Sequence, residues 1–165
     1  MPEMFLGRYV SLGFLGRGNM GQVWLAHPLG QRDRRVVVKV MDPTIASKPQ
    51  FRQLFEREIQ SMARLRHPYI VQFLDSSSND PNGPCLVMEF VQGETLERLL
   101  EKQDRLPVGQ AGLLLGCLCH ALETAHAIGI VHRDLKPTNV MVVGAGTLEQ
   151  SLKVMDFGLA QFAAR

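Results

Sequence analysis

The residues best suited to do chemistry together lie in two short polar stretches near the end of the chain. The first places a carboxylate, a cation and an amide within a few residues, at Asp134, Lys136 and Asn139. The second is an Asp-Phe-Gly triplet that begins at Asp156, after another apolar stretch. A hard cation such as Mg²⁺ prefers carboxylate and amide oxygens, a positive charge stabilises a transferred phosphoryl group, and a carboxylate can orient an attacking hydroxyl. This order of residues predicts phosphoryl transfer, with Asn139 and Asp156 as metal ligands.

A glycine-rich turn near the start of the chain is a candidate phosphate-binding loop. Gly16, Gly18, Gly21 and Val23 fit the pattern GxGxxGxV. Glycines lack a Cβ atom, so their backbone amides can approach phosphate oxygens. A dinucleotide-binding fingerprint would open a helix directly after the last glycine, but Val23 leads into residues with strand character. A plain glycine hairpin remains an alternative, and the GxxxxGK[ST] motif of P-loop NTPases does not occur.

Lys39 and Glu58 are predicted to form an ion pair. Lys39 lies in an otherwise apolar stretch, where a lysine without an anionic partner is costly. In the following helical segment, Glu58 shares the stripe of Phe55 and Met62 at spacings of three and four residues. A glutamate on a buried stripe is a natural partner for a buried lysine. Two unrelated exposed charges are the alternative interpretation.

The elements that must position these residues are predicted to be mainly strands in the first half of the chain and mainly helices later. Residues 9–26 and 36–41 predict strands, residues 50–66 predict a helix that ends at His67-Pro68, and strands are expected near 70–75 and 85–90. Two helices near 94–103 and 108–128 follow, then short strands at 140–143 and 152–155. This order predicts an α+β chain in two lobes. The boundary is expected at Gln92-Gly93, which gives an N-lobe of residues 1–91 and a partial C-lobe of residues 92–165.

Composition narrows the class of protein. The 165 residues are 45% hydrophobic and 21% charged, which is typical of a globular chain, and the net charge of +2 gives no reason to expect a nucleic-acid partner. The three cysteines have neither a disulfide framework nor zinc spacing. No signal peptide is recognised, and the longest apolar run is too short to span a bilayer. We therefore expect a cytoplasmic protein without a membrane segment.

Together these segments resemble the eukaryotic-like Ser/Thr protein kinase family, in particular its bacterial members. The resemblance covers essentially residues 9–161 and is carried by the stretches 15–21, 86–93 and 129–136. A lysine two residues after Asp134 is typical of Ser/Thr-type kinases. The resemblance implies a two-lobed protein-kinase-like fold with a complete β-rich N-lobe, ATP and Mg²⁺ as cofactors, and a protein substrate.

The resemblance also assigns roles to individual residues. Asp134 would be the catalytic base or the residue that orients the substrate hydroxyl, and Lys136 would contact the γ-phosphate. Lys39 would hold the α- and β-phosphates while paired with Glu58, and Asn139 and Asp156 would bind Mg²⁺. Met62, Phe73, His132 and Phe157 would form an apolar stack that links the lobes. The remaining nucleotide-binding residues would be the glycine-loop residues Leu15, Gly16, Gly18 and Gly21, the adenine-facing Val23, Val37 and Met141, the gatekeeper Met88, and the backbone groups of Glu89 and Val91.

Two departures from the family pattern bear on function. The family usually has alanine where this chain has Val37, which adds two methyl groups over the expected adenine site. Only seven residues follow Gly158, so the helical C-lobe is expected to be incomplete. The helix near 108–128 is apolar around most of its circumference, and self-association through it is expected. An active kinase and a kinase-like nucleotide-binding or regulatory module without transfer activity therefore both remain open.

Overall fold

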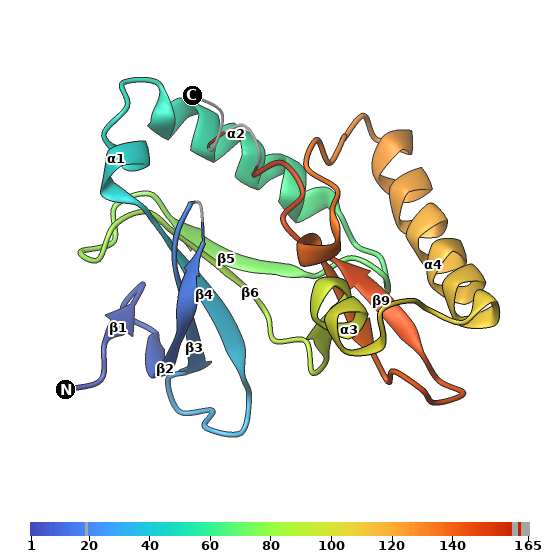
Figure 1. Ribbon diagram of the computed structural model, residues 1–165. Coiled ribbons are helices and arrows are strands. Elements are labelled where there is room, and N and C mark those ends of the chain that lie inside the picture. Colours follow the sequence, from blue (N-terminus) through green and yellow to red (C-terminus); the bar gives the residue numbers. More distant parts are fainter. Residues whose placement is uncertain (19, 160–161, 163–165) are drawn as a thin grey trace. The chain divides into compact units, whose positions relative to one another are not determined.

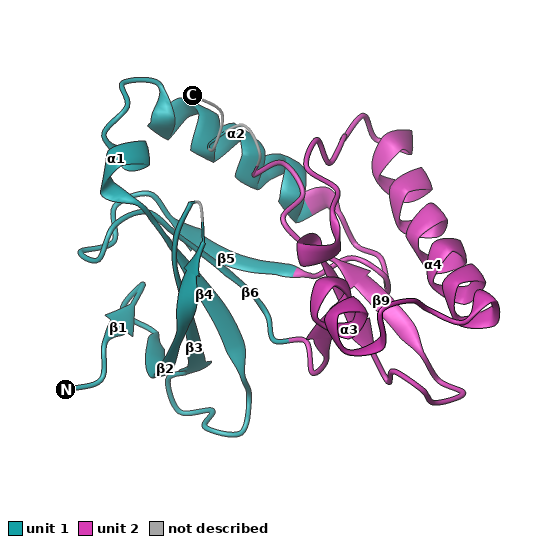
Figure 2. Cartoon of the chain, in the orientation of Figure 1, with its two compact units in different colours: residues 1–63, 73–90, 161–165 teal, residues 64–72, 91–160 magenta. Residues whose placement is uncertain are grey.

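The computed structural model describes residues 1–18, 20–159 and 162 of the chain. These residues form two compact units (Figure 2). Unit 1 holds residues 1–63 and 73–90 together with Phe162, and unit 2 holds residues 64–72 and 91–159. Residues 64–72 thus belong to the second unit although they precede the last two strands of the first.

Unit 1 is built on a six-stranded antiparallel sheet in the order β1-β2-β3-β4-β6-β5 (Figure 1). The glycine-rich stretch forms the β2–β3 hairpin, and the β-branched run that contains Lys39 forms β4. β4 lies between β3 and β6, so both of its edges are paired. The strands are β1 (Met4–Phe5), β2 (Tyr9–Gly18), β3 (Gly21–Pro28), β4 (Val36–Met41), β5 (Phe73–Ser77) and β6 (Cys85–Glu89).

Alternation along β4 creates two faces of different character, because successive strand residues point to opposite sides. Val36, Val38 and Val40 are buried in one apolar cluster. Lys39 lies on the opposite face, together with Val37. The buried members of the apolar cluster from other strands are Phe5, Ala26, Cys85 and Val87.

Two helices accompany this sheet. The four-residue α1 (Pro43–Ala46) is capped by Asp42, whose carboxylate accepts hydrogen bonds from the Thr44 N–H at 2.8 Å and the Thr44 hydroxyl at 2.6 Å. These bonds lower the pKa of Asp42 below its ordinary value. In α2 (Phe51–Arg64) the buried positions are Phe51, Phe55, Glu58 and Met62.

The segment before β2 is tied into unit 1. Phe5 is fully buried, and the Leu6 N–H donates to the Asp80 carboxylate at 2.6 Å. The Arg8 guanidinium donates to both carboxylate oxygens of Asp75, at 2.8 and 2.9 Å. The apolar anchor is the main stabilising contact, because the Arg8 side chain is 61% exposed and exposed ion pairs contribute little.

Unit 2 combines a small sheet, in the order β7-β8-β9, with two α-helices. α4 packs against β9, and α3 packs against β8. Its apolar core includes Leu99, Leu114, Val142, Val154 and Phe157. The elements are β7 (Glu94–Thr95), α3 (Leu96–Gln103), α4 (Val108–Ala127), the 3₁₀ helix η1 (Pro137–Asn139), β8 (Val140–Val143) and β9 (Ser151–Val154).

A glycine is required at position 93, just before the first strand of the unit 2 sheet. A Cβ atom at this position would lie 2.2 Å from the Val142 carbonyl oxygen. That separation is far below contact distance, so only glycine lets the chain pass β8 this closely. Thr95 then caps α3 by accepting the Arg98 N–H at 3.2 Å.

Several expected elements differ in extent from those observed. α2 ends at Arg64, before His67-Pro68, and α3 starts two residues late because Glu94 and Thr95 pair with β8. The strand expected near 70–75 begins at Phe73, while Ile70 makes only an isolated parallel bridge to Val154. β1 and α1 were not expected. Each is too short to carry a periodic pattern.

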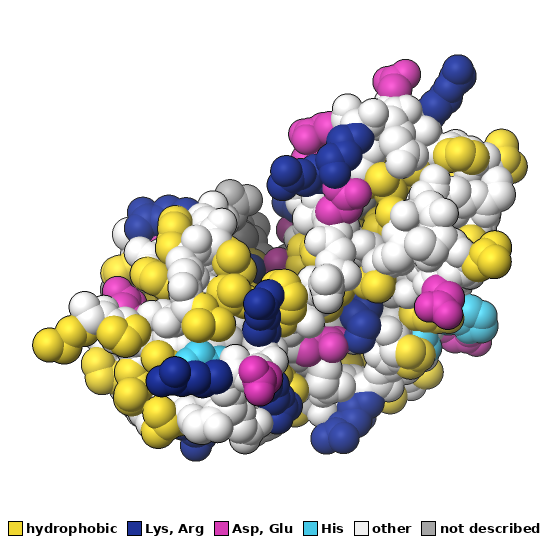
Figure 3. All heavy atoms as spheres, turned by 90° about the horizontal axis from the view of Figure 1, so that it is seen from below, with side chains coloured by type: hydrophobic (Ala, Val, Ile, Leu, Met, Phe, Trp, Pro, Cys, Tyr) yellow, Lys and Arg dark blue, Asp and Glu magenta, His cyan; other side chains and the backbone are white. Residues whose placement is uncertain are grey.

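The surface carries charges of both signs. On the face shown in Figure 3, Lys and Arg side chains are interspersed with Asp and Glu side chains. Within the described part of the chain, none of the helices combines the length and apolar composition that a bilayer crossing requires.

Candidate active site

The strand that carries Lys39 brings four candidate nucleotide-binding residues onto one face of the unit 1 sheet. Lys39 lies opposite Val23 on one side and Leu86 on the other. Val37 lies opposite Met88. Directly opposed residues share a face, and so do residues two apart on one strand. Val23, Val37, Lys39 and Met88 therefore line the same side of the sheet.

Lys39 and Glu58 are both buried. Their exposed fractions are 7% and 6%. Glu58 follows Phe55 by three residues on the buried stripe of α2. Because buried charges require partners, this burial supports the proposed ion pair, which stays a prediction.

The glycines of the glycine-rich loop differ in how closely other backbone atoms approach them. Gly21 has φ +144°, and a Cβ atom there would lie 1.9 Å from the Val40 carbonyl oxygen. At Gly16 and Gly18 a Cβ atom would meet nothing within 4 Å among the described atoms. The close approach to β4 therefore demands glycine at position 21. Gly16, with φ +158°, also has a backbone conformation that other residues rarely adopt, and the space beside Gly16 and Gly18 is open among the described atoms. Leu15, beside them, is 53% exposed.

In unit 2, His132 joins the two polar stretches that hold the candidate catalytic residues. Its Nδ1 atom accepts the Asp134 N–H at 3.1 Å, which assigns the ring proton to Nε2. Nε2 then donates to the Met155 carbonyl oxygen at 2.7 Å. The imidazole is 2% exposed and meets the Phe157 ring edge to face, with centroids 4.7 Å apart. The histidine thus fixes the first polar stretch against the residue before Asp156.

Asp134, Lys136 and Asn139 are gathered by short contacts. The Asn139 amide Nδ2 donates to the Asp134 carbonyl oxygen at 2.8 Å and lies 3.4 Å from its carboxylate. The Lys136 ammonium is 3.3 Å from the Asp134 carboxylate, and both side chains are 44% exposed. Asn139 is buried. Because its Nδ2 faces Asp134, the Oδ1 of this amide is turned the other way, as an oxygen ligand for a cation would require.

Strained backbone marks the same region. Arg133 and Asp156 have φ values of 67° and 63°, in the left-handed region that non-glycine residues seldom adopt. Such conformations persist where the surrounding structure imposes them, and they cluster at functional sites. The Met155 N–H donates to the Asn139 carbonyl oxygen at 2.9 Å, so Asn139 is anchored to the residue before Asp156.

The candidate residues fall into two groups that the structure describes separately. Within unit 2, hydrogen bonds or ion pairs join Asp134, Lys136 and Asn139, and a backbone bond links Asn139 to the residue before Asp156. Unit 1 holds Leu15, Gly16, Gly18, Gly21, Val23, Val37, Lys39, Glu58, Met88 and Glu89, and unit 2 holds Val91, Asp134, Lys136, Asn139, Met141 and Asp156.

A comparison with models of protein families matches residues 9–165 to the protein kinase domain. The chain belongs to the protein kinase family. The two-lobed kinase-like fold expected from the sequence is confirmed by this match and by solved kinase domains.

Curated relatives are bacterial kinases. A probable serine/threonine-protein kinase of Streptomyces coelicolor is 42% identical over 164 residues, which cover 97% of this chain and 24% of that protein. Serine/threonine-protein kinase PknA of Mycobacterium tuberculosis is 39% identical over 161 residues, which cover 94% of this chain and 36% of that protein. The chain thus spans about a quarter to a third of these relatives.

Among solved structures, the crystal structure of a double mutant of the Mycobacterium tuberculosis PknI kinase domain aligns with a TM-score of 0.82 and 30% identity. The alignment covers 99% of this chain and 64% of the PknI chain. The kinase fold is therefore shared along nearly the whole length of the 165 residues.

Sequence reasoning missed the backbone groups that support the candidate site. The Met155 carbonyl anchors His132 from 23 positions away, and the Asn139 carbonyl receives the Met155 N–H. Any residue could supply these groups, so residue types carry no signal for them. Of the apolar stack expected from Met62, Phe73, His132 and Phe157, the described contact is the His132–Phe157 pair.

Proposed function

We propose that this chain carries the ATP-binding and catalytic elements of a protein kinase that transfers the γ-phosphate to Ser or Thr hydroxyls of proteins. The main support is the hydrogen-bonded set of Asp134, Lys136 and Asn139, held by His132 and Met155 beside Asp156. The family match and the names of the relatives agree with this chemistry.

Asp134 and Lys136 would act on the reacting groups. Asp134 is partly exposed, so it can accept the proton of the substrate hydroxyl. The hydroxyl oxygen forms a bond to the γ-phosphorus, the bond from that phosphorus to the bridging oxygen breaks, and ADP leaves. Lys136, 3.3 Å from Asp134, can neutralise charge on the transferred group.

Asn139 and Asp156 have the ligand chemistry that Mg²⁺ prefers. One supplies an amide oxygen and the other a carboxylate, and Mg²⁺ sites at phosphates typically use one or two protein ligands with water and phosphate oxygens. When bound, Mg²⁺ would neutralise phosphate charge.

The nucleotide would be held by the face of the sheet that carries Lys39. Gly16 and Gly18 leave room for phosphate oxygens near the backbone, and Lys39 would contact the α- and β-phosphates while paired with Glu58. Val23, Val37 and Met141 would contact the adenine ring. The hinge contacts would come from Met88, Glu89 and Val91, and Leu15 would cover the ring from the glycine loop.

The roles of the two aspartates can be separated by experiment. Calorimetry would measure Mg²⁺-dependent ATP affinity for the wild type, Asp156→Asn and Asp134→Asn, after circular dichroism shows that all three are folded. We expect a loss of affinity for Asp156→Asn, which lacks a metal ligand, and little change for Asp134→Asn. An equal loss for both, or a larger loss for Asp134→Asn, contradicts the assigned roles.

A second candidate is a nucleotide-binding or regulatory module that does not transfer phosphate. The 165 residues align with 64% of the PknI kinase-domain structure, so transfer activity of these residues by themselves needs a test of its own. Incubation with γ-labelled ATP and a generic protein substrate separates the two. Label transfer that Asp134→Asn abolishes supports the kinase, whereas tight Mg²⁺–ATP binding without any transfer supports the module.

A further inference from the structure

The segment that joins α2 to β5, residues 65–72, contains a turn that a histidine side chain closes. The His67 carbonyl oxygen accepts the Ile70 N–H at 3.1 Å, and Pro68 supplies the fixed φ that suits the second position of such a turn. The His67 Nδ1 atom accepts the Tyr69 N–H at 3.0 Å. A backbone amide only donates, so Nδ1 carries no proton and the imidazole is neutral, with its proton on Nε2.

This turn holds the chain against the end of β9. The Tyr69 carbonyl oxygen accepts the Val154 N–H at 2.9 Å, and the Val71 N–H donates to the Val154 carbonyl oxygen at 2.9 Å. Between them, Ile70 forms a parallel bridge to Val154 and is 3% exposed. Val154 is the last residue of β9 and lies two positions before Asp156. The His67 turn therefore supports the strand that leads to a candidate metal ligand.

The surroundings of His67 favour its neutral form. Its ring meets the Tyr69 ring edge to face, with centroids 5.3 Å apart, and His120 of α4 repels a positive charge on it. Burial, and to a smaller extent His120, lower the pKa of His67 below the ordinary value of a histidine, and no carboxylate of the described residues counters them. Tyr69 lies beside the Cys117 thiol of α4, which raises the pKa of the Tyr69 hydroxyl. Of these side chains, only imidazoles ordinarily change charge between about pH 5 and pH 8.

We propose that His67 is a pH-sensitive switch: a proton on Nδ1 removes the acceptor of the Tyr69 N–H and loosens the chain from β9. In the imidazolium form both ring nitrogens are donors, so Nδ1 would face the amide proton of Tyr69 and the bond is lost. Because the pKa of His67 is lower in the closed turn, opening takes up a proton. The stability of the closed turn is therefore fully present above the ordinary histidine pKa, and declines as the pH falls toward the folded-state pKa.

NMR titration of the 165-residue chain from neutral pH to about pH 5 tests the switch. At neutral pH, long-range ¹H–¹⁵N spectra should show the His67 proton on Nε2. As His67 takes up its second proton, the Tyr69 and Val154 amide signals should shift with the same midpoint. Hydrogen exchange at Tyr69, corrected for the intrinsic effect of pH, should become about two- to tenfold faster, as expected for the loss of one hydrogen bond.

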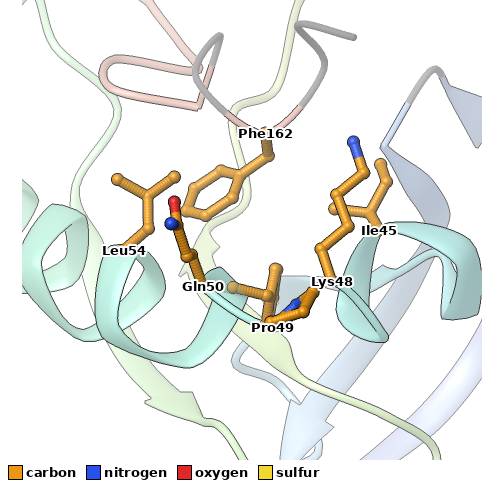
Figure 4. A pocket seen from close by; sticks show the side chains of 7 residues that line it. Ile45, Lys48, Pro49, Gln50, Leu54 and Phe162 are labelled. Atoms are coloured by element: carbon orange, nitrogen blue, oxygen red, sulfur yellow. The ribbon is translucent and has the colours of Figure 1, made fainter.

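The pocket between α1 and the start of α2 provides an internal reference. Figure 4 shows Ile45, Pro49 and Leu54 among the side chains that line it. Its described lining contains no His, Asp or Glu, and the Asp42 carboxylate that caps α1 has a lowered pKa. The Ile45 and Leu54 amides should therefore keep their positions while Tyr69 shifts. A shared midpoint would show a general loosening of the fold and overturn the switch.

Two substitutions at position 67 separate the effect of the proton from that of the side chain. His67→Asn keeps an acceptor, because an asparagine oxygen before proline commonly bonds the backbone N–H two residues on, but it does not titrate. Its Tyr69 amide should stay protected throughout the titration. His67→Ala, which has no acceptor, should show fast exchange already at neutral pH. Acceleration at acid pH in His67→Asn equal to that of the wild type would overturn the proposal.

A substitution outside the turn provides a second test. His120→Gln removes the repulsion from α4, so the midpoints of His67 and of the Tyr69 amide should rise together. His126→Gln, at another exposed histidine of α4, is the matched control and should leave both midpoints unchanged. A Tyr69 midpoint that does not follow that of His67 would refute the link between the proton and the turn.

The consequence for nucleotide binding rests on the proposed function, in which Asp156 binds Mg²⁺. Calorimetry of Mg²⁺–ATP binding at neutral pH and at about pH 5.5 should show a larger loss of affinity in the wild type than in His67→Asn, since protonation of the nucleotide itself affects both equally. Equal losses would refute the coupling to Asp156 and leave the switch standing. A chain that binds no ATP at all would instead refute the proposed function, and the NMR result would be unaffected.

Discussion

Gly18 and Gly21 belong to the same glycine-rich turn, yet different partners constrain them. Gly21 sits against the backbone of β4, where a Cβ atom would lie 1.9 Å from the Val40 carbonyl oxygen. Gly18 faces open space among the described atoms. The open space at Gly18 agrees with the phosphate-binding role proposed for this loop.

The two glycines should therefore respond differently to alanine. Gly21→Ala should lower the free energy of unfolding by more than about 2 kcal/mol, because strands β3 and β4 must separate to admit the methyl group. Gly18→Ala should change it by less than about 0.5 kcal/mol and weaken ATP binding. Urea unfolding followed by circular dichroism, with calorimetry of ATP binding, measures both effects. Equal destabilisation by the two substitutions would count against this division.

Lys39→Met should reduce phosphoryl transfer by about 100-fold or more wherever the chain is active. The side chain is buried on the sheet face that also carries Val23 and Met88, so its loss removes a fixed positive charge from the expected phosphate site. Initial rates with γ-labelled ATP provide the measurement. Lys102→Met, which removes an exposed lysine paired with Glu94, is the control. Wild-type turnover by Lys39→Met would disprove the assignment.

At the scale of elements, α1 depends on its cap because four residues cannot sustain a helix alone. The Asp42 carboxylate accepts both Thr44 donors, and this lowers its pKa below its ordinary value. A carboxylate whose pKa is lower in the folded state than in the unfolded state stabilises the fold. This stabilisation is fully present at pH values above the unfolded-state pKa, and it is lost as the pH falls through the folded-state pKa. The cap should thus be intact at neutral pH and weaken as the pH falls below the ordinary pKa of an aspartate.

Thr44→Val should raise the pKa of Asp42 toward its ordinary value, because the threonine hydroxyl is the largest cause of the lowering. An NMR titration of the Asp42 side-chain carboxyl carbon measures this. Thr147→Val, in the β8–β9 turn, is a control that should leave the Asp42 pKa unchanged. An unaltered pKa in Thr44→Val would show that the hydroxyl does not stabilise the carboxylate.

How far an element could be predicted depended on how much periodic sequence it contains. The strand at 36–41 was predicted with its observed bounds because its β-branched run is continuous, and α2 was predicted because its apolar stripe spans several turns. α1 and β1 were not predicted because a single helical turn and a two-residue strand are too short to show a hydrophobic period. In the site, residue types and their order indicated Asp134, Lys136, Asn139 and Asp156, whereas contacts of backbone atoms distant in sequence, such as His132 with Met155, needed the structure.

At the scale of the whole chain, α4 combines a buried side with exposed apolar side chains on its flanks. Leu114, Cys117, Ala121 and Ala125 are buried against unit 2, as a helix that packs on β9 requires. Leu113 and Leu115 are 48% and 59% exposed, and Val108 at the start of the helix is 90% exposed. Leu113 and Leu115 are two residues apart, so they lie on opposite flanks of the buried side. Exposed large apolar side chains on a helix favour association with another apolar surface.

We therefore expect the 165-residue chain to self-associate through α4. In light scattering, the mean mass of the wild-type chain should rise with concentration. The double substitution Leu113→Gln/Leu115→Gln should reduce this rise without loss of helicity. Leu148→Gln, which alters a fully exposed leucine in the β8–β9 turn, should have no such effect. A wild-type chain that stays a monodisperse monomer over the concentration series would disprove the expectation.

The burial of Phe5 has a practical consequence for anyone who redraws the limits of this domain. The family match begins at residue 9, so an expression plasmid designed on that match alone would omit Phe5. Such a shortened protein would lose a fully buried aromatic ring from the unit 1 core and leave Trp24, whose ring centroid lies 5.9 Å from that of Phe5, open to solvent. Deleting a buried phenylalanine costs about 3–5 kcal/mol, a large share of a small domain's stability. Poor solubility of such a product would then reflect the cloning boundary rather than the kinase itself.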